Sequence, residues 1–94
     1  MVIVYGGVEV EPARVPEVTD AARAFESSCR EEEGCVQYVL SWRVDEPSRI
    51  QLLEVWESES AWEAHKKQTH VLEWTSFIRD ASAASPEFSH HVLA

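Results

Sequence analysis

Residues 49–57 restrict the fold more than any other segment, because they alternate like a β-strand and are apolar on both faces. One face carries Ile50, Leu52 and Trp56, and the other carries Leu53 and Val55. A strand of this kind must be covered on both sides, since large apolar side chains are rarely left in water over a whole sheet face. The rest of the chain must therefore supply two layers of cover.

A long amphipathic helix is predicted over residues 15–32. Its apolar side chains recur at alternating spacings of three and four residues, which places them on one helix face. They are Val15, Val18, Ala22, Phe25 and Cys29. Gly34 follows this run at a position suited to the left-handed conformation that ends many helices.

Three further segments are rich in β-branched and aromatic residues and are predicted to be strands. They span residues 2–10, 35–44 and 87–93. In the first strand, Gly6 and Gly7 indicate either a bulge or a point where another group approaches the backbone closely. In the second, strict alternation places Val36 and Tyr38 on one face and Cys35 on the other.

A second helical region is predicted after the third strand. Ser58 is expected to cap a helix that starts at Glu59. This helix should loosen between Gln68 and His70, and a second helical stretch with a broad apolar stripe should continue until Pro86 ends the region.

The order of these elements is β-α-β-β-α-β, which predicts an α+β, ferredoxin-like fold for a single domain of residues 1–94. Its four-stranded antiparallel sheet has helices on one face only. The opposite face, which carries Leu53 and Val55, would remain open in a monomer. We therefore expect a homodimer in which a second copy covers the open sheet face.

Charge and composition exclude several kinds of partner. The chain has 17 acidic against 8 basic residues and a formal charge of -9, so nucleic acid and anionic membrane surfaces would repel it. No apolar run approaches the roughly 20 residues that span a bilayer, and no basic leader precedes the first apolar run. Cys29 and Cys35 are best interpreted as small buried thiols, and a cytoplasmic location is expected.

Two sequence stretches carry a resemblance to a known family. They are EEEGCVQY at residues 31–38 and LLEVWESESAWEAHKKQTH at residues 52–70. Together they resemble the antibiotic biosynthesis monooxygenase family, whose members are dimeric α+β barrel proteins. The matching positions are Gly34, Cys35, Tyr38, Glu54, Trp56, Glu57, Ala64, His65 and His70.

The resemblance implies oxygenation of a small electron-rich aromatic molecule, such as a quinol or an anthrone, without metal, flavin or haem. His65 is the candidate catalytic residue, because histidine accepts protons near neutral pH. The candidate substrate-binding residues are Tyr38, Trp56, Trp62, His70, Trp74 and Phe77. Degradation of haem is disfavoured, since His65 stands where the haem-degrading members carry a tryptophan and Thr75 lies near their axial-ligand position.

Other readings of these residues remain open. The alternative interpretation of His65 is a structural histidine bonded to Glu54 or to a backbone carbonyl, and the alternative for His70 is a residue that caps or hinges two helices. Glu54 requires a partner among apolar neighbours, for which Arg43, Arg49, His65 or the partner subunit are candidates. His65 and His70 are five residues apart, which misses the spacing of a metal pair on one continuous helix.

Two further function classes share the predicted fold. The first is a non-catalytic or accessory dimer that binds a hydrophobic ligand in the same cavity, and the second is an isomerase or lyase on the same scaffold. Consumption of dioxygen with a quinol panel distinguishes a monooxygenase from both.

Overall fold

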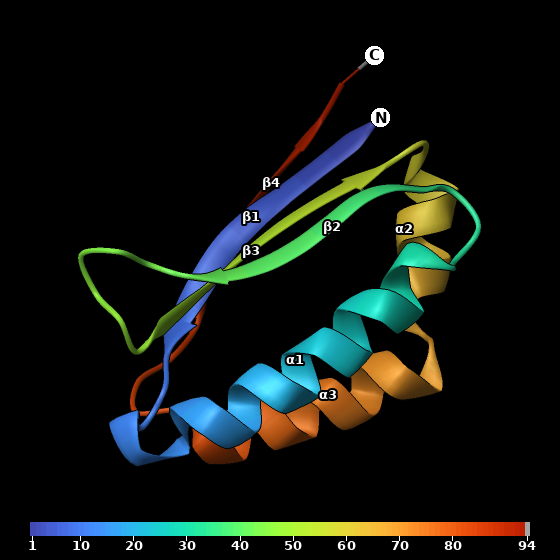
Figure 1. Ribbon diagram of the computed structural model, residues 1–94. Coiled ribbons are helices and arrows are strands. Elements are labelled where there is room, and N and C mark those ends of the chain that lie inside the picture. The colour runs from blue at the N-terminus through green and yellow to red at the C-terminus, as the bar shows by residue number, and fades with distance from the viewer. Residues whose placement is uncertain (94) are drawn as a thin grey trace.

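The computed structural model describes residues 1–93, in which four strands form one antiparallel sheet with the order β2-β3-β1-β4. The strands are β1 (Val2–Glu9), β2 (Cys35–Trp42), β3 (Arg49–Trp56) and β4 (Glu87–Val92). The helices are η1 (Pro12–Arg14), α1 (Val15–Arg30), α2 (Glu59–Lys66) and α3 (Thr69–Ala81). Figure 1 shows α1, α2 and α3 on the same side of the sheet. The ferredoxin-like prediction is confirmed; Ala94, the last residue of the predicted domain, lies outside the described residues.

Local sequence explains where the helices begin and end. Gly34 has a φ of 83°, and a Cβ there would lie 2.5 Å from the Cβ of Ala61, so both backbone and space require glycine. The helix predicted to reach residue 32 ends at Arg30. The side chain of Ser58 accepts a hydrogen bond from the backbone N–H of Ala61 at 3.1 Å, which confirms the predicted cap of α2.

The two adjacent glycines of β1 mark a close approach between strands. The pairing of β1 with β3 and with β4 runs through both glycines without a shift in register. A Cβ on Gly6 would overlap the carbonyl oxygen of Glu87 and lie 2.5 Å from the ring of Phe88. Of the two predicted alternatives, the structure therefore has the close approach and not the bulge.

Strict alternation is wrong at the start of β2. The register against β3 shifts between Cys35 and Gln37, so one extra residue is accommodated there. Cys35 consequently packs against the buried core, whereas Val36 is 53% exposed. β2 also ends at Trp42, and Val44, which was predicted to continue it, is fully exposed.

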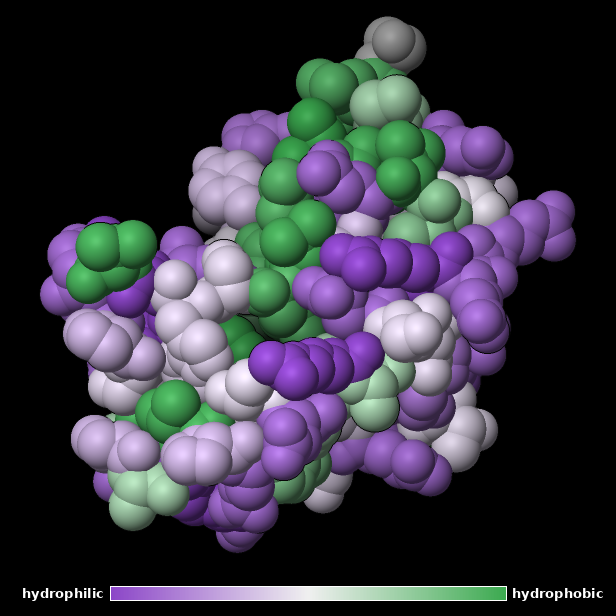
Figure 2. Space-filling view, in the orientation of Figure 1, coloured by the Kyte–Doolittle hydropathy of each residue, from purple (hydrophilic) through white to green (hydrophobic). Residues whose placement is uncertain are grey.

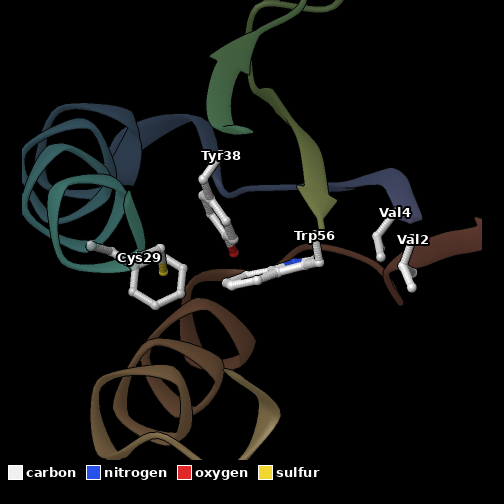
Figure 3. Close-up of a cluster of buried hydrophobic side chains, with 6 residues drawn as sticks. Val2, Val4, Cys29, Tyr38 and Trp56 are labelled. Carbon is white, nitrogen blue, oxygen red and sulfur yellow. The ribbon is translucent and has the colours of Figure 1, made fainter. Parts of the chain in front are cut away.

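The core lies between the inner sheet face and the helices, in two clusters along the length of α1. One cluster consists of Val2, Val4, Phe25, Cys29, Tyr38 and Trp56. Figure 3 shows the hydroxyl end of Tyr38 directed between Cys29 and the ring of Trp56. The other cluster consists of Val8, Val10, Val18, Ala22, Ile50 and Ala81.

The outer sheet face has no helix over it within residues 1–93. Here β3 contributes Leu53 and Val55, and β1 contributes Ile3 and Tyr5; all are apolar or aromatic, and Tyr5 is 46% exposed. Figure 2 shows hydrophobic residues gathered in a band over the strands. The prediction of a sheet that is apolar on both faces is confirmed. Among the described residues, no helix has the length and apolar character to cross a membrane.

Candidate functional site

A cavity of about 780 Å³ lies between the inner sheet face, α2, α3 and the segment that follows α3. Its lining is mostly apolar. The apolar and aromatic lining residues include Val4, Val8, Phe25, Leu40, Ile50, Leu52, Trp62, Val71, Trp74, Ile78 and Phe88. Polar groups are fewer: Tyr38, Glu54, His65, Lys66, Thr75, Arg79, Ser82 and Ser85. An apolar chamber with a few polar groups of this kind is typical of a small-molecule site.

His65 is the buried histidine of this cavity. It lies in the last turn of α2 and is only 3% exposed, with its ring 4.5 Å from the Trp56 ring and 5.5 Å from the Tyr38 ring. Its Nδ1 lies 2.9 Å from Oε2 of Glu32, and its Nε2 lies 3.5 Å from Oε1 of Glu54. The imidazole is thus held between two carboxyl groups that come from different elements.

Glu32 connects two histidines. Besides accepting from Nδ1 of His65, its Oε2 lies 2.8 Å from Nε2 of His70 at the start of α3. The Glu32 side chain is 9% exposed. A carboxylate that accepts two N–H groups fixes which nitrogen of each ring carries the hydrogen. In this arrangement Nδ1 of His65 is the donor, and its Nε2 is the nitrogen left to accept a proton.

Glu54 lies on the inner face of β3 and is 5% exposed. The indole Nε1 of Trp56 donates a hydrogen bond to its Oε1 at 2.7 Å. Burial raises the pKa of the Glu54 carboxyl, while the indole hydrogen bond and His65 act in the opposite direction. The two arginines that the sequence suggested as partners of Glu54 bind other residues: Arg43 binds Asp45, and Arg49 binds Gln51.

Tyr38 of β2 is one of the residues that line the cavity. It is 3% exposed, and burial raises the pKa of its phenol far above the usual value. The group therefore stays protonated at neutral pH. Burial likewise raises the pKa of the neighbouring Cys29 thiol.

The predicted aromatic residues divide between the lining and the support of the cavity. Trp62 and Trp74 line it, and Trp74 stacks on Phe25 at 4.7 Å. Trp56 is fully buried beneath Glu54 and His65 and does not line the cavity. Phe77 is also outside the lining and packs on Trp74 at 5.9 Å.

His70, predicted as a substrate-binding residue, faces the cluster around Glu32 and is absent from the cavity lining. The structure also brings in residues that sequence reasoning did not select. Glu32 is the most important of these, followed by Lys66 and Arg79, which add positive charge to the lining. In the sequence, Glu32 cannot be distinguished from its neighbours Glu31 and Glu33 until the conformation of the turn is known.

Fold and site together define a class of protein: an α+β, ferredoxin-like domain with an aromatic-lined cavity between its sheet and helices and a histidine at the cavity wall. The chain matches the family model described as "Antibiotic biosynthesis monooxygenase" over residues 1–76. It is 30% identical over 70 residues to a Bacillus subtilis (strain 168) protein named "Putative monooxygenase YcnE", and the alignment covers 74% of each chain. The chain belongs to the antibiotic biosynthesis monooxygenase family, as its sequence motifs indicated.

Solved structures confirm the fold. A crystal structure described as an antibiotic biosynthesis monooxygenase superposes with a TM-score of 0.92 at 18% identity, covering 100% of this chain and 99% of the other. The structure of Rv0793 from Mycobacterium tuberculosis gives a TM-score of 0.89 at 19% identity, with 99% and 94% covered. At these identities the likeness concerns the fold alone.

Proposed function

We propose that the protein is a cofactor-independent monooxygenase that oxidises a small phenolic, quinol-type or polyketide-type aromatic molecule with dioxygen. Membership of the antibiotic biosynthesis monooxygenase family supports the reaction class. The aromatic and aliphatic lining of the cavity supports an aromatic substrate. The observation that carries the proposal is the placement of His65, whose Nδ1 is bound to Glu32 while the ring lines the cavity.

His65 acts as the proton acceptor in this mechanism. With its Nδ1 hydrogen donated to Glu32, the neutral imidazole presents a lone pair on Nε2 to the substrate hydroxyl. Glu32 also stabilises the imidazolium that forms when the proton arrives. Tyr38 contributes to substrate binding as part of the cavity wall, on which the aromatic substrate packs.

Loss of the proton makes the substrate a phenolate or enolate that is electron-rich enough to pass an electron to dioxygen. One oxygen atom then enters the organic product and the other leaves as water, with the substrate supplying all the electrons. Arg79 places positive charge in the lining, which favours the anionic substrate, whereas the ammonium of Lys66 is paired with Glu63. The apolar walls exclude water from the reactive oxygen species.

A homodimer is part of the proposal. The outer sheet face exposes apolar residues of β1 and β3, and Figure 2 shows the hydrophobic band that a second copy would cover. Covering this face would stiffen the sheet that carries Tyr38 and Glu54. We also propose a cytoplasmic location, in which the free thiols Cys29 and Cys35 would stay reduced.

Oxygen consumption with a panel of quinols and anthrones tests the proposal. We expect oxygen uptake with at least one panel member, and a loss of at least about tenfold in kcat for His65→Gln. The matched control is Glu73→Gln, which changes an exposed residue of α3 outside the cavity lining. A protein that bound these molecules without consuming oxygen would be a ligand-binding dimer, and equal uptake by His65→Gln would exclude His65 as the base.

A further inference from the structure

Four side chains with metal-binding atoms meet beside the cavity, and we propose that they form a site for a divalent transition metal ion, with Zn²⁺ as the preferred occupant. The thiol of Cys29, the carboxylate of Glu32 and ring nitrogens of His65 and His70 all lie within 4.8 Å of one another. The proposal goes beyond the catalytic one, because the nitrogen of His65 that faces this cluster is Nδ1, whereas proton transfer uses Nε2.

The break between α2 and α3 is what brings the two histidines together. His65 and His70 are five residues apart, a spacing that would separate their rings on one continuous helix. However, α2 ends at Lys66 and α3 begins at Thr69, so the two residues belong to different helices. The objection from sequence spacing therefore does not apply to this structure.

The donor atoms lie within about one ångström of the spacing that a tetrahedral zinc ion requires. Oε2 of Glu32 lies 2.9 Å from Nδ1 of His65 and 2.8 Å from Nε2 of His70. Ligand bonds of about 2.0–2.3 Å in a tetrahedral zinc site put donor atoms about 3.3–3.7 Å apart. Binding of an ion would thus require the Glu32 carboxylate to move away from the two rings by roughly half an ångström. The donor atoms that are farthest apart, at up to 4.8 Å, would have to approach each other by about one ångström.

The chemistry of the donor set favours zinc over magnesium or calcium. A thiolate and two imidazoles are ligands that zinc binds well, whereas magnesium and calcium prefer oxygen atoms throughout. The negative charges of a Cys29 thiolate and the Glu32 carboxylate balance a divalent ion, so the occupied site is electrically neutral. Neutrality matters because Cys29 is fully buried and the Glu32 side chain is 9% exposed.

Glu54 completes the surroundings as an outer partner of His65. With a metal on Nδ1, the ring hydrogen moves to Nε2, which lies 3.5 Å from Oε1 of Glu54. A carboxylate that accepts from the far nitrogen of a liganding histidine is a common arrangement in zinc proteins. With 30% of its side chain exposed, His70 is more open to solvent than Glu32, His65 or Cys29.

Occupancy of this site has a consequence for the cavity. A histidine with a metal on Nδ1 and a hydrogen on Nε2 has no lone pair for a substrate proton. Zn²⁺ is therefore expected to inhibit any reaction that uses His65 as the base.

Calorimetric titration of the chelator-stripped full chain with Zn²⁺ tests the site without a substrate. We expect one ion per chain in the wild type and unchanged binding in the controls His91→Gln and Cys35→Ser. The variants His70→Gln and Cys29→Ser should bind at least about tenfold more weakly. Circular dichroism establishes that each variant is folded, and the partly exposed His70 keeps the test valid if Cys29→Ser does not fold.

Cobalt supplies an independent readout of the thiolate. With Co²⁺ in place of Zn²⁺, a thiolate-to-metal charge-transfer band should appear in the wild type and in Cys35→Ser and be lost in Cys29→Ser. Absence of Zn²⁺ binding by the wild type, or equal binding by His70→Gln and His91→Gln, would overturn the proposal. Either result leaves oxygen uptake by the metal-free protein unaffected, so the two proposals fail separately.

Discussion

The indole N–H of Trp56 points at Glu54: Nε1 lies 2.7 Å from the carboxyl Oε1, and both side chains are buried on the inner face of the sheet. Both residues lie on the same face of the sheet because they are two positions apart on β3. The tryptophan that was expected to wall the cavity thus holds a carboxyl group at its wall instead. A buried polar group without such a donor would strongly destabilise the fold.

Glu54 is expected to make stability depend on pH. Its folded-state pKa is raised above the ordinary value of 4.5 because it is buried, so the folded protein holds this proton more tightly than the unfolded chain. Its contribution to the free energy of unfolding is then fully present below about pH 4.5 and is lost as pH rises through the raised pKa. Urea denaturation of wild type and Glu54→Gln across this range should show the difference.

The exposed Glu57 on the same segment provides the control. Glu57→Gln should follow the wild-type pH dependence, whereas Glu54→Gln should lack the component that declines with rising pH. Parallel curves for Glu54→Gln and wild type would show that the carboxyl titrates alike in the folded and unfolded chains.

Glu32 is expected to act on the reaction through His65 alone. In chelator-treated protein, Glu32→Gln should lower kcat by at least about tenfold, because an orienting carboxylate fixes the tautomer of its histidine. Nitrogen-15 NMR of the imidazole should show the hydrogen on Nδ1 of His65 in the wild type and a changed tautomer mixture in the variant. The exposed neighbour Glu33 supplies the control, since Glu33→Gln should alter neither quantity.

Replacement of Gly34 by alanine, which adds only a methyl group, is expected to destabilise the fold. Gly34→Ala must hold an alanine at a φ of 83° and place its Cβ against that of Ala61, so we expect a loss of about 1–3 kcal/mol in the free energy of unfolding. A double-mutant cycle with Ala61→Gly separates the two causes, because the second change relieves only the contact. Unchanged stability of Gly34→Ala in urea denaturation would contradict this view of the turn.

The outer sheet face should govern assembly. Leu53→Glu places a carboxylate in the proposed dimer interface of an already acidic protein, so we expect it to shift the chain to monomer in sedimentation velocity. Leu72→Glu makes the same change on α3, at a leucine that is 60% exposed, and should remain dimeric. A monomeric wild type would remove the interface from the proposal.

The fold was predictable because it depends on local patterns that can be recognised in a single sequence. The two apolar faces of β3 and the cap at Ser58 are both patterns of this kind. The bulge that exposes Val36 was not, since one extra residue in a strand changes no residue type. Alternation alone therefore assigned Val36 to the wrong face.

The site was predictable only in part. His65 was selected because it matches the family motif and because histidine accepts protons near neutral pH, and it does line the cavity. Glu32 contacts His65 and His70 through a turn and a helix break, although these residues lie 33 and 38 positions away from it in the chain. Contacts of this range depend on tertiary packing and leave no spacing signal in one sequence.

Isotope labelling tests the proposed oxygen chemistry most directly. A panel substrate that the metal-free protein converts should be incubated under ¹⁸O₂, and the product analysed by mass spectrometry. We expect one labelled oxygen atom in the product of the wild type, and a matching loss of labelled product with His65→Gln. A product without the label, or with oxygen drawn from water, would contradict a monooxygenase reaction in this cavity.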